Sequence, residues 1–131
     1  MGDTNYLIDT NAIIDFMASR LPEAGMSFIS DLVDDIPKIS VITQIELLGF
    51  DGPQQDMALL EDFIIHSEIY PLNNPVVDMC ILLRKHYRIR LPDAIIAATA
   101  KVNSFHIITR NVKDFKNIKN LQIINPHEIG S

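Results

Sequence analysis

The chain has 131 residues, 47% of them hydrophobic, and its formal net charge is −6 at pH 7. This length predicts one domain over residues 1–131 with a hydrophobic core of its own. It contains no apolar run of membrane-spanning length, its opening residues do not resemble a signal peptide, and its lone cysteine excludes an internal disulfide and a thiolate zinc site. We therefore expect a cytoplasmic protein that does not contact a membrane.

Apolar runs of strand length alternate with segments of helical periodicity along the chain. Such alternation is typical of parallel strands joined by right-handed helical crossovers, so the predicted fold class is α/β. In chain order, we predict a strand at 6–8, helices at 12–17 and 26–33, a strand at 38–42, helices at 45–48 and 53–64, a strand at 68–72, helices at 75–87 and 92–100, and strands at 105–108 and 121–124.

Four acidic residues, Asp9, Glu46, Asp93 and Asp114, stand where predicted strands give way to helices or loops. An open α/β sheet gathers the C-terminal ends of its strands, and ligands bind in the crevice beyond those ends. Carboxylates gathered there repel one another, and a divalent cation such as Mg²⁺ or Mn²⁺, which favours oxygen ligands, relieves that repulsion. The joint pattern therefore favours a metal-dependent enzyme over an ordinary small α/β domain.

The first two acids also have purely structural explanations. Asp9 is a good helix N-cap at the end of its strand. The segment 43–46 matches a capping box, in which Thr43 caps the helix and Glu46 reaches back to the N-cap amide. Taken singly, neither residue requires a functional role.

Asp93 and Asp114 are ambiguous in the same way. Asp93 follows a proline in the first turn of a predicted helix, where the positive helix end favours a carboxylate. Asp114 lies just after a strand, in a segment that a surface loop explains as well as a site does. The alternative to an enzyme is therefore a protein-interaction module whose carboxylates only cap helices, and specific Mn²⁺ binding would separate the two.

Segments 7–11, 41–47, 91–100 and 109–115 resemble the four motifs of the PIN-domain nucleases, in order and at the spacing of that family. The likeness spans nearly the whole chain, and it is strongest to the VapC-type toxins of bacterial and archaeal toxin–antitoxin pairs. The resemblance implies a three-layer α/β sandwich, with a central five-stranded parallel sheet flanked by about seven helices.

The same resemblance implies cleavage of RNA that depends on Mg²⁺ or Mn²⁺. Its catalytic and metal-binding residues would be Asp9, Glu46, Asp93 and Asp114, although the fourth ligand stays open between Asn111 and Asp114. Further polar residues expected to line the site are Thr10, Thr109 and Asn111.

The resemblance also implies partners: an RNA substrate, a small cognate antitoxin and a second copy of the chain in a homodimer. Basic residues are concentrated in the second half of the chain, so one basic face could meet the RNA despite the acidic total. From charge alone, a pair of solvated helix faces is the simpler explanation. The candidates for phosphate contacts are Arg84, Lys85, Arg88, Arg110 and Lys113. A candidate groove for the antitoxin involves Met17, Met26, Phe28 and Ile29, for which ordinary core packing is the simpler explanation.

Overall fold

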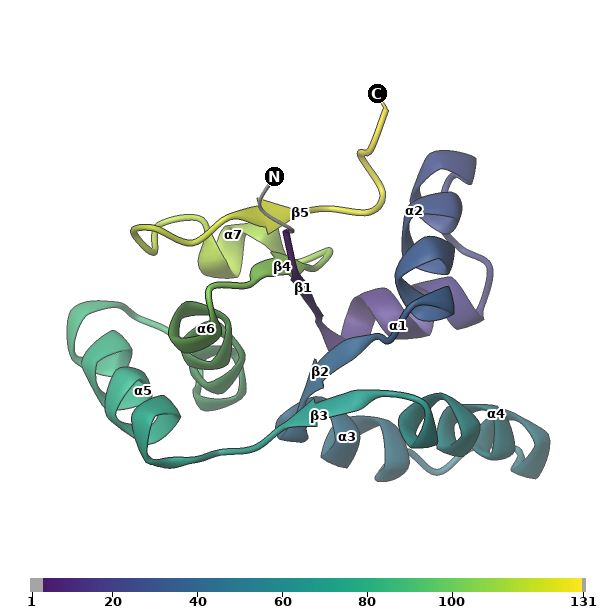
Figure 1. The fold of residues 1–131 in the computed structure, drawn as a ribbon, viewed down its shortest axis with the longest axis horizontal. Coiled ribbons are helices and arrows are strands. Elements are labelled where there is room, and N and C mark those ends of the chain that lie inside the picture. The colour runs from purple at the N-terminus through teal and green to yellow at the C-terminus, as the bar shows by residue number, and fades with distance from the viewer. Residues whose placement is uncertain (1–3, 131) are drawn as a thin grey trace.

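The computed structural model describes residues 4–130, and five parallel strands form its centre. The strand order is β3-β2-β1-β4-β5, so the first strand of the chain lies in the middle of the sheet (Figure 1). In register, Leu7 pairs with Ile107 and Ile8 with Ile108, which aligns the ends of β1 and β4. The strands are β1 (Tyr6–Ile8), β2 (Lys38–Ser40), β3 (Glu68–Tyr70), β4 (His106–Ile108) and β5 (Ile123–Ile124).

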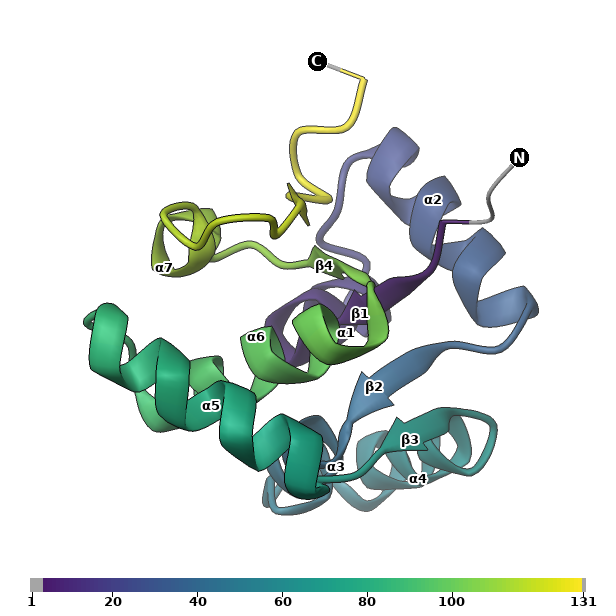
Figure 2. The same cartoon turned by 60° about the vertical axis from the view of Figure 1, so that its left-hand side comes forward.

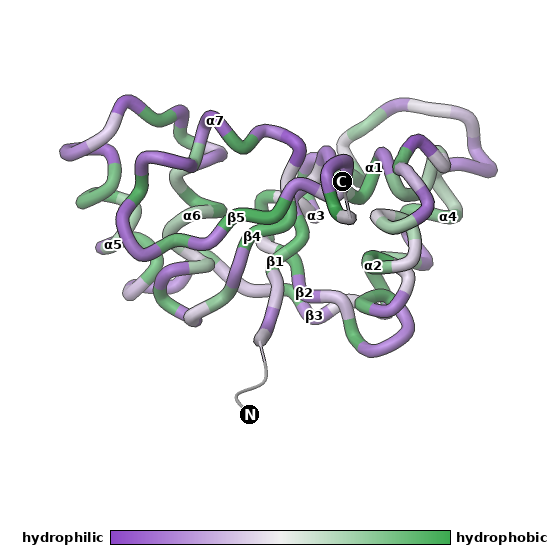
Figure 3. The backbone as a smooth tube through the Cα atoms, turned by 90° about the horizontal axis from the view of Figure 1, so that it is seen from above, coloured by the Kyte–Doolittle hydropathy of each residue, from purple (hydrophilic) through white to green (hydrophobic). Residues whose placement is uncertain are grey.

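Seven helices of the described chain cover the two faces of this sheet, which confirms the predicted α/β sandwich. Seen from above, α5, α6 and α7 lie on one side of the hydrophobic strands, and α1, α2 and α4 lie on the other (Figure 3). Within residues 4–130, no helix has the length and apolar character that crossing a membrane requires. The helices are α1 (Thr10–Met17), α2 (Glu23–Asp34), α3 (Val41–Leu48), α4 (Gln54–Ile65), α5 (Asn74–His86), α6 (Leu91–Asn103) and α7 (Val112–Phe115).

Each face of the sheet has its own hydrophobic core, because side chains alternate along a strand. Leu7 and Ile107 pack with α5 and α6, whereas Ile8 and Ile108 pack with α1 to α4. Helix α6 lies along α5 (Figure 2), and its residues 94–100 are all buried, as the apolar sequence predicted. Burial on both faces holds the strand ends, and therefore the residues that follow them, in fixed positions.

Several predicted boundaries are wrong. The strand predicted at 38–42 ends at Ser40, and residues 41 and 42 begin α3 instead. The strands predicted at 68–72, 105–108 and 121–124 are each shorter in the structure. Asp114, for which a surface loop was one prediction, lies in the short helix α7. Helix α6 begins at Leu91, so the proline after it is not the first helical residue.

The C-terminal segment after β5 packs closely against α2. Gly25 is buried in α2, and a Cβ atom added there would lie 2.0 Å from the carbonyl oxygen of Pro126. No side chain has room at such a distance, so glycine is required by the close approach of two backbone segments.

We expect Gly25→Ala to lower the free energy of unfolding by about 1–3 kcal/mol through overpacking. Elsewhere in a helix, alanine would instead stabilise by about 1 kcal/mol relative to glycine. Urea denaturation measures the difference, and Ser27→Ala, at an exposed position of the same helix, is the control. Equal stability of Gly25→Ala and the wild type would contradict the close packing of the C-terminal segment.

Candidate functional site

The ends of β1 and β4 bring the first predicted site residues together. Asp9 follows β1 and Thr109 follows β4, and these strands are neighbours in the sheet. The Thr109 hydroxyl donates a hydrogen bond of 2.8 Å to Oδ2 of Asp9, although the residues are 100 positions apart. Both residues are buried. Parallel pairing of the two strands is thus the direct cause of this contact.

Asp9 also caps helix α1, so its structural explanation holds alongside any functional one. Its Oδ1 accepts a 2.8 Å hydrogen bond from the backbone N–H of Thr10. Its Oδ2 accepts a second one, 3.0 Å long, from the side-chain amide of Asn11. Asn11 in turn accepts from the backbone N–H of Arg110 at 2.9 Å. These bonds fix the carboxylate of Asp9 in one orientation.

Glu46 is not part of a capping box, which corrects the prediction for segment 43–46. Helix α3 is capped by Ser40, whose Oγ accepts a 3.1 Å hydrogen bond from the backbone N–H of Ile42. Thr43 therefore lies inside the helix, and Glu46 is one turn further along. Its Oε1 accepts a 2.6 Å hydrogen bond from the hydroxyl of Thr10. The carboxylate consequently faces α1 and the end of β1 rather than its own helix start.

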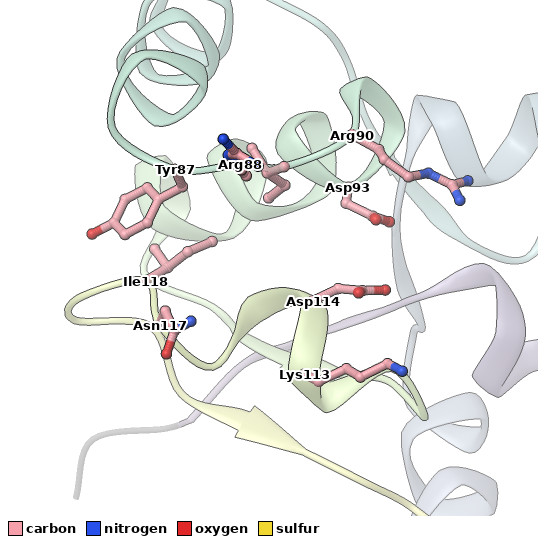
Figure 4. Close-up of a pocket in the computed structure, with 9 residues that line it drawn as sticks. Tyr87, Arg88, Arg90, Asp93, Lys113, Asp114, Asn117 and Ile118 are labelled. Atoms are coloured by element: carbon pink, nitrogen blue, oxygen red, sulfur yellow. The ribbon is translucent and has the colours of Figure 1, made fainter.

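Asp93 and Asp114 both line a cavity of about 330 Å³, and their carboxylates point toward the same end of it (Figure 4). Asp93 is in the first turn of α6, and Asp114 is on α7. The buried Phe115 next to Asp114 holds α7 against the core, which positions this carboxylate. Asn111, the alternative fourth ligand, is the N-cap of α7 and does not line the cavity. The geometry therefore associates Asp114 rather than Asn111 with Asp93.

The carboxylates interact electrostatically as one cluster. Burial raises the pKa of Asp9 to about 6, against hydrogen bonds that lower it, and the negative charges of Asp93 and Glu46 raise it further. Burial likewise raises the pKa of Asp93, with contributions from the charges of Asp114 and Glu46 and an opposing one from Arg90. The charges of the other predicted acids thus act on the pKa of Asp9 or on that of Asp93.

The donor set fits a hard divalent cation in its chemistry. The predicted ligands are all carboxylates, which suit Mg²⁺ or Mn²⁺ and not a metal that prefers sulfur. The two charges that act on Asp9 are both negative, so a bound cation would relieve their repulsion. Among residues 4–130, no three His, Cys, Asp or Glu side chains are arranged to hold an ion as they stand. A bound ion would therefore keep part of its water shell or draw the side chains inward.

The basic residues predicted to contact RNA do not form one surface: some line the cavity, two are on α5 and one is in an ion pair. Arg88 and Lys113 line the cavity beside the acids, together with Arg90, which the prediction missed although it ends the same basic run. Arg84 is in the exposed last turn of α5, where it favours the negative helix end.

Arg110 is instead held by a buried acid that the sequence did not single out. Its Nη1 lies 3.0 Å from both carboxylate oxygens of Asp15, a residue of α1 whose side chain is 1% exposed. Nε2 of His127 in the C-terminal segment contacts the same carboxylate at 2.8 Å. The available signal was helical spacing, because Asp15 follows the buried Ala12 by three positions and so shares its face.

Comparisons with known proteins identify similar sequences and similar folds. The sequence profile of the PIN domain family matches residues 6–121. Among solved structures, the chain is similar to one in a toxin–antitoxin complex from Klebsiella pneumoniae (28% identity over 95% of this chain and 100% of that one, TM-score 0.77). It is also similar to one in VapBC-1 from nontypeable Haemophilus influenzae (27% identity over 94% and 98%, TM-score 0.75). Comparison with curated proteins gives no match.

The raised pKa of Asp9 predicts how stability depends on pH in the absence of metal. The folded protein binds this proton more tightly than the unfolded chain, whose pKa is near 3.8, so stability falls as pH rises from about 4 to about 6. We expect Asp9→Asn to flatten that part of the profile and to remove a penalty of about 1–3 kcal/mol at pH 7.

Urea denaturation across this pH range, with a chelator and then with Mg²⁺, measures both effects. Mg²⁺ should stabilise the wild type at pH 7 and leave Asp9→Asn unchanged. Asp31→Asn, at an exposed helical position, is the control and should behave as the wild type. Parallel pH profiles for the wild type and Asp9→Asn would contradict the electrostatic account of the site.

Proposed function

Because this chain belongs to the PIN domain family, we propose that it is a metal-dependent endoribonuclease and the toxin of a toxin–antitoxin pair. The observation that carries the proposal is the convergence of four carboxylates at one end of the sheet, with a buried Asp9 among them. The nuclease domain would span residues 1–131, and the protein would act on RNA in the cytoplasm.

Each carboxylate has a distinct part in the proposed mechanism. Asp9 and Asp93 would hold the principal Mg²⁺ or Mn²⁺ ion, and Glu46 and Asp114 would complete the site directly or through water. When bound, such an ion lowers the pKa of a water molecule and offsets negative charge on the phosphate. Thr109 and Asn11 keep the Asp9 carboxylate oriented through their hydrogen bonds, as Thr10 does for Glu46.

The non-catalytic alternative finds limited support. Asp9 does cap α1, as an interaction module would require. Glu46, however, accepts its hydrogen bond from Thr10 on another helix, and the cap of its own helix is Ser40. Helix ends therefore account for Asp9 and for Asp93 and Asp114, which lie in the first turns of α6 and α7, but they do not account for Glu46.

For the antitoxin, we propose a groove formed by two adjoining hollows over α1 and α4. They measure about 690 and 400 Å³, and both are lined by Met17 and Leu59. Acidic side chains also line them, so the complementary partner is an amphipathic segment with basic flanks. Of the residues first considered, Ile29 is buried and Met26 and Phe28 pack against the core, so only Met17 contributes.

We further propose a homodimer, as the family resemblance implies. Val77 and Ile81 are exposed one turn apart on α5 and supply an apolar strip on that helix. Helix α5 lies on the other side of the strands from α1 and α4 (Figure 3). Exposed apolar side chains of this kind are suitable for association with a second copy.

Asp9→Asn and Asp93→Asn should each lower Mn²⁺-dependent cleavage of RNA by more than about a hundredfold, because removing a ligand costs at least as much as disturbing its support. Cleavage of labelled single-stranded RNA is the measurement, and circular dichroism checks that each variant is folded. Asp78→Asn, at an exposed position of α5 remote from the motifs, should cleave normally. Full activity in either site variant would refute the assignment.

Leu59→Glu should weaken antitoxin binding by about 2 kcal/mol, since it places a charge in the apolar groove, and should leave RNA cleavage unchanged. Leu59 is 60% exposed and lines both hollows. Ile65→Glu is a matched control, because Ile65 is also in α4, is 77% exposed and lines neither hollow. Affinity for the co-expressed antitoxin is the measurement, and an equal effect of both substitutions would place its docking surface elsewhere.

A further inference from the structure

The cavity beside the carboxylates extends beyond what metal binding requires. Its walls come from the connection between α5 and α6, from the first turn of α6, and from α7 with the residues that follow it. Only two of its lining residues, Asp93 and Asp114, are acids. The rest of the cavity therefore needs an occupant of different chemistry.

The cavity has two chemically different ends (Figure 4). The carboxylates of Asp93 and Asp114 and the charged ends of Arg90 and Lys113 point the same way, toward one end. Tyr87 and Asn117 lie at the other end, with the apolar Ile118 between them. The charged end, together with a bound cation, suits an anionic group. The end with the aromatic ring and the amide suits a planar polar ring.

We propose that this cavity binds one nucleotide of a single-stranded RNA, with its phosphate at the charged end and its base at the Tyr87–Asn117 end. The part of the inference that concerns RNA cleavage rests on the proposed function. The cavity has a volume of about 330 Å³, which is at the lower end of the range of about 300–1,000 Å³ for small-ligand pockets. It accommodates one residue of a strand and excludes a duplex.

The residues at each end have separate roles in this proposal. Lys113 and Arg90 attract the phosphate and offset the negative field of the acids. Tyr87 offers a ring to the base, as aromatic side chains do in many single-strand binding sites. The ring is held from both sides: it packs against the core, and its hydroxyl accepts a 3.4 Å hydrogen bond from the backbone N–H of Lys119.

Asn117 is the specificity-determining residue in this arrangement. Its side-chain amide carries both donors and an acceptor, which is the pattern that reads the edge of a base. It is exposed and lies two residues after the end of α7, so this helix and the residues that follow it carry a proposed metal ligand, a phosphate contact and the base contact. Base preference and cleavage position would thereby be coupled through one rigid element.

The test compares ligands that differ only in the base. Nucleoside 5′-monophosphates and ribose 5-phosphate are titrated into the wild-type protein with Mg²⁺ by calorimetry. We expect the best nucleotide to bind at least about tenfold more tightly than ribose 5-phosphate, the gain that base stacking typically provides. Tyr87→Leu should remove this gain, Tyr87→Phe should keep it, and Asn117→Ala should change the order of preference among the four bases.

Two lysines provide the control for the phosphate end. Lys113 and Lys116 are both exposed and three positions apart, but only Lys113 lines the cavity. Lys113→Ala should weaken the binding of nucleotides and of ribose 5-phosphate by the same several-fold factor. Lys116→Ala should leave both affinities unchanged.

Equal affinity for nucleotides and ribose 5-phosphate in the wild type would overturn the inference, even if the protein cleaves RNA. A base-dependent gain that survives both Tyr87→Leu and Asn117→Ala would also overturn it, because the base would then lie elsewhere. A gain that these variants alter, in a protein that cleaves no RNA, would support the nucleotide cavity and refute the proposed nuclease activity. The two proposals therefore fail on different observations.

Discussion

Burial of a carboxylate beside other acids, at the C-terminal end of a parallel sheet, is the constraint on which the rest of this structure depends. Asp9 is buried, and the charges closest to it are those of other acids, so its ionised form is disfavoured in the folded protein. The two hydrophobic cores, one on each face of the sheet, supply the stability that keeps these groups together. A divalent cation would convert this unfavourable arrangement into a binding site.

The polar residues around Asp9 act as a support for the cluster. Thr109, Asn11 and Thr10 each direct a hydrogen-bond donor at a carboxylate, and each is held by the end of a strand or the start of a helix. A second layer of support lies behind them, where buried Asp15 pairs with Arg110. Because the backbone N–H of Arg110 binds Asn11, this ion pair is connected to the support of Asp9. The site is thus defined by a network rather than by the acids alone.

The sequence was sufficient for the fold class, because the α/β alternation follows from periodicity, and the acids after its strand ends stay a prediction of the site. It was insufficient where tertiary contacts outweigh local preference. Val41 and Ile42 are β-branched and suggest a strand, yet Ser40 caps a helix that begins with them. Asp15 could not be identified by its type, since an isolated acid is normally exposed and its partners lie some 95 and 112 positions away. Arg90 and Asn117 line the same cavity, and only the tertiary structure brings these two positions together.

The central position of β1 bears on the order in which the cluster assembles during folding. This strand pairs on one side with β4, and the loop and short helix after β4 carry Thr109 and Asp114. The contact between Asp9 and Thr109 therefore joins positions 100 apart in the chain. Contacts of such sequence separation form more slowly than local ones, because a long loop must close first. The cap of α1 can thus form from neighbouring residues, whereas the grouping of the acids has to wait until β4 has paired with β1.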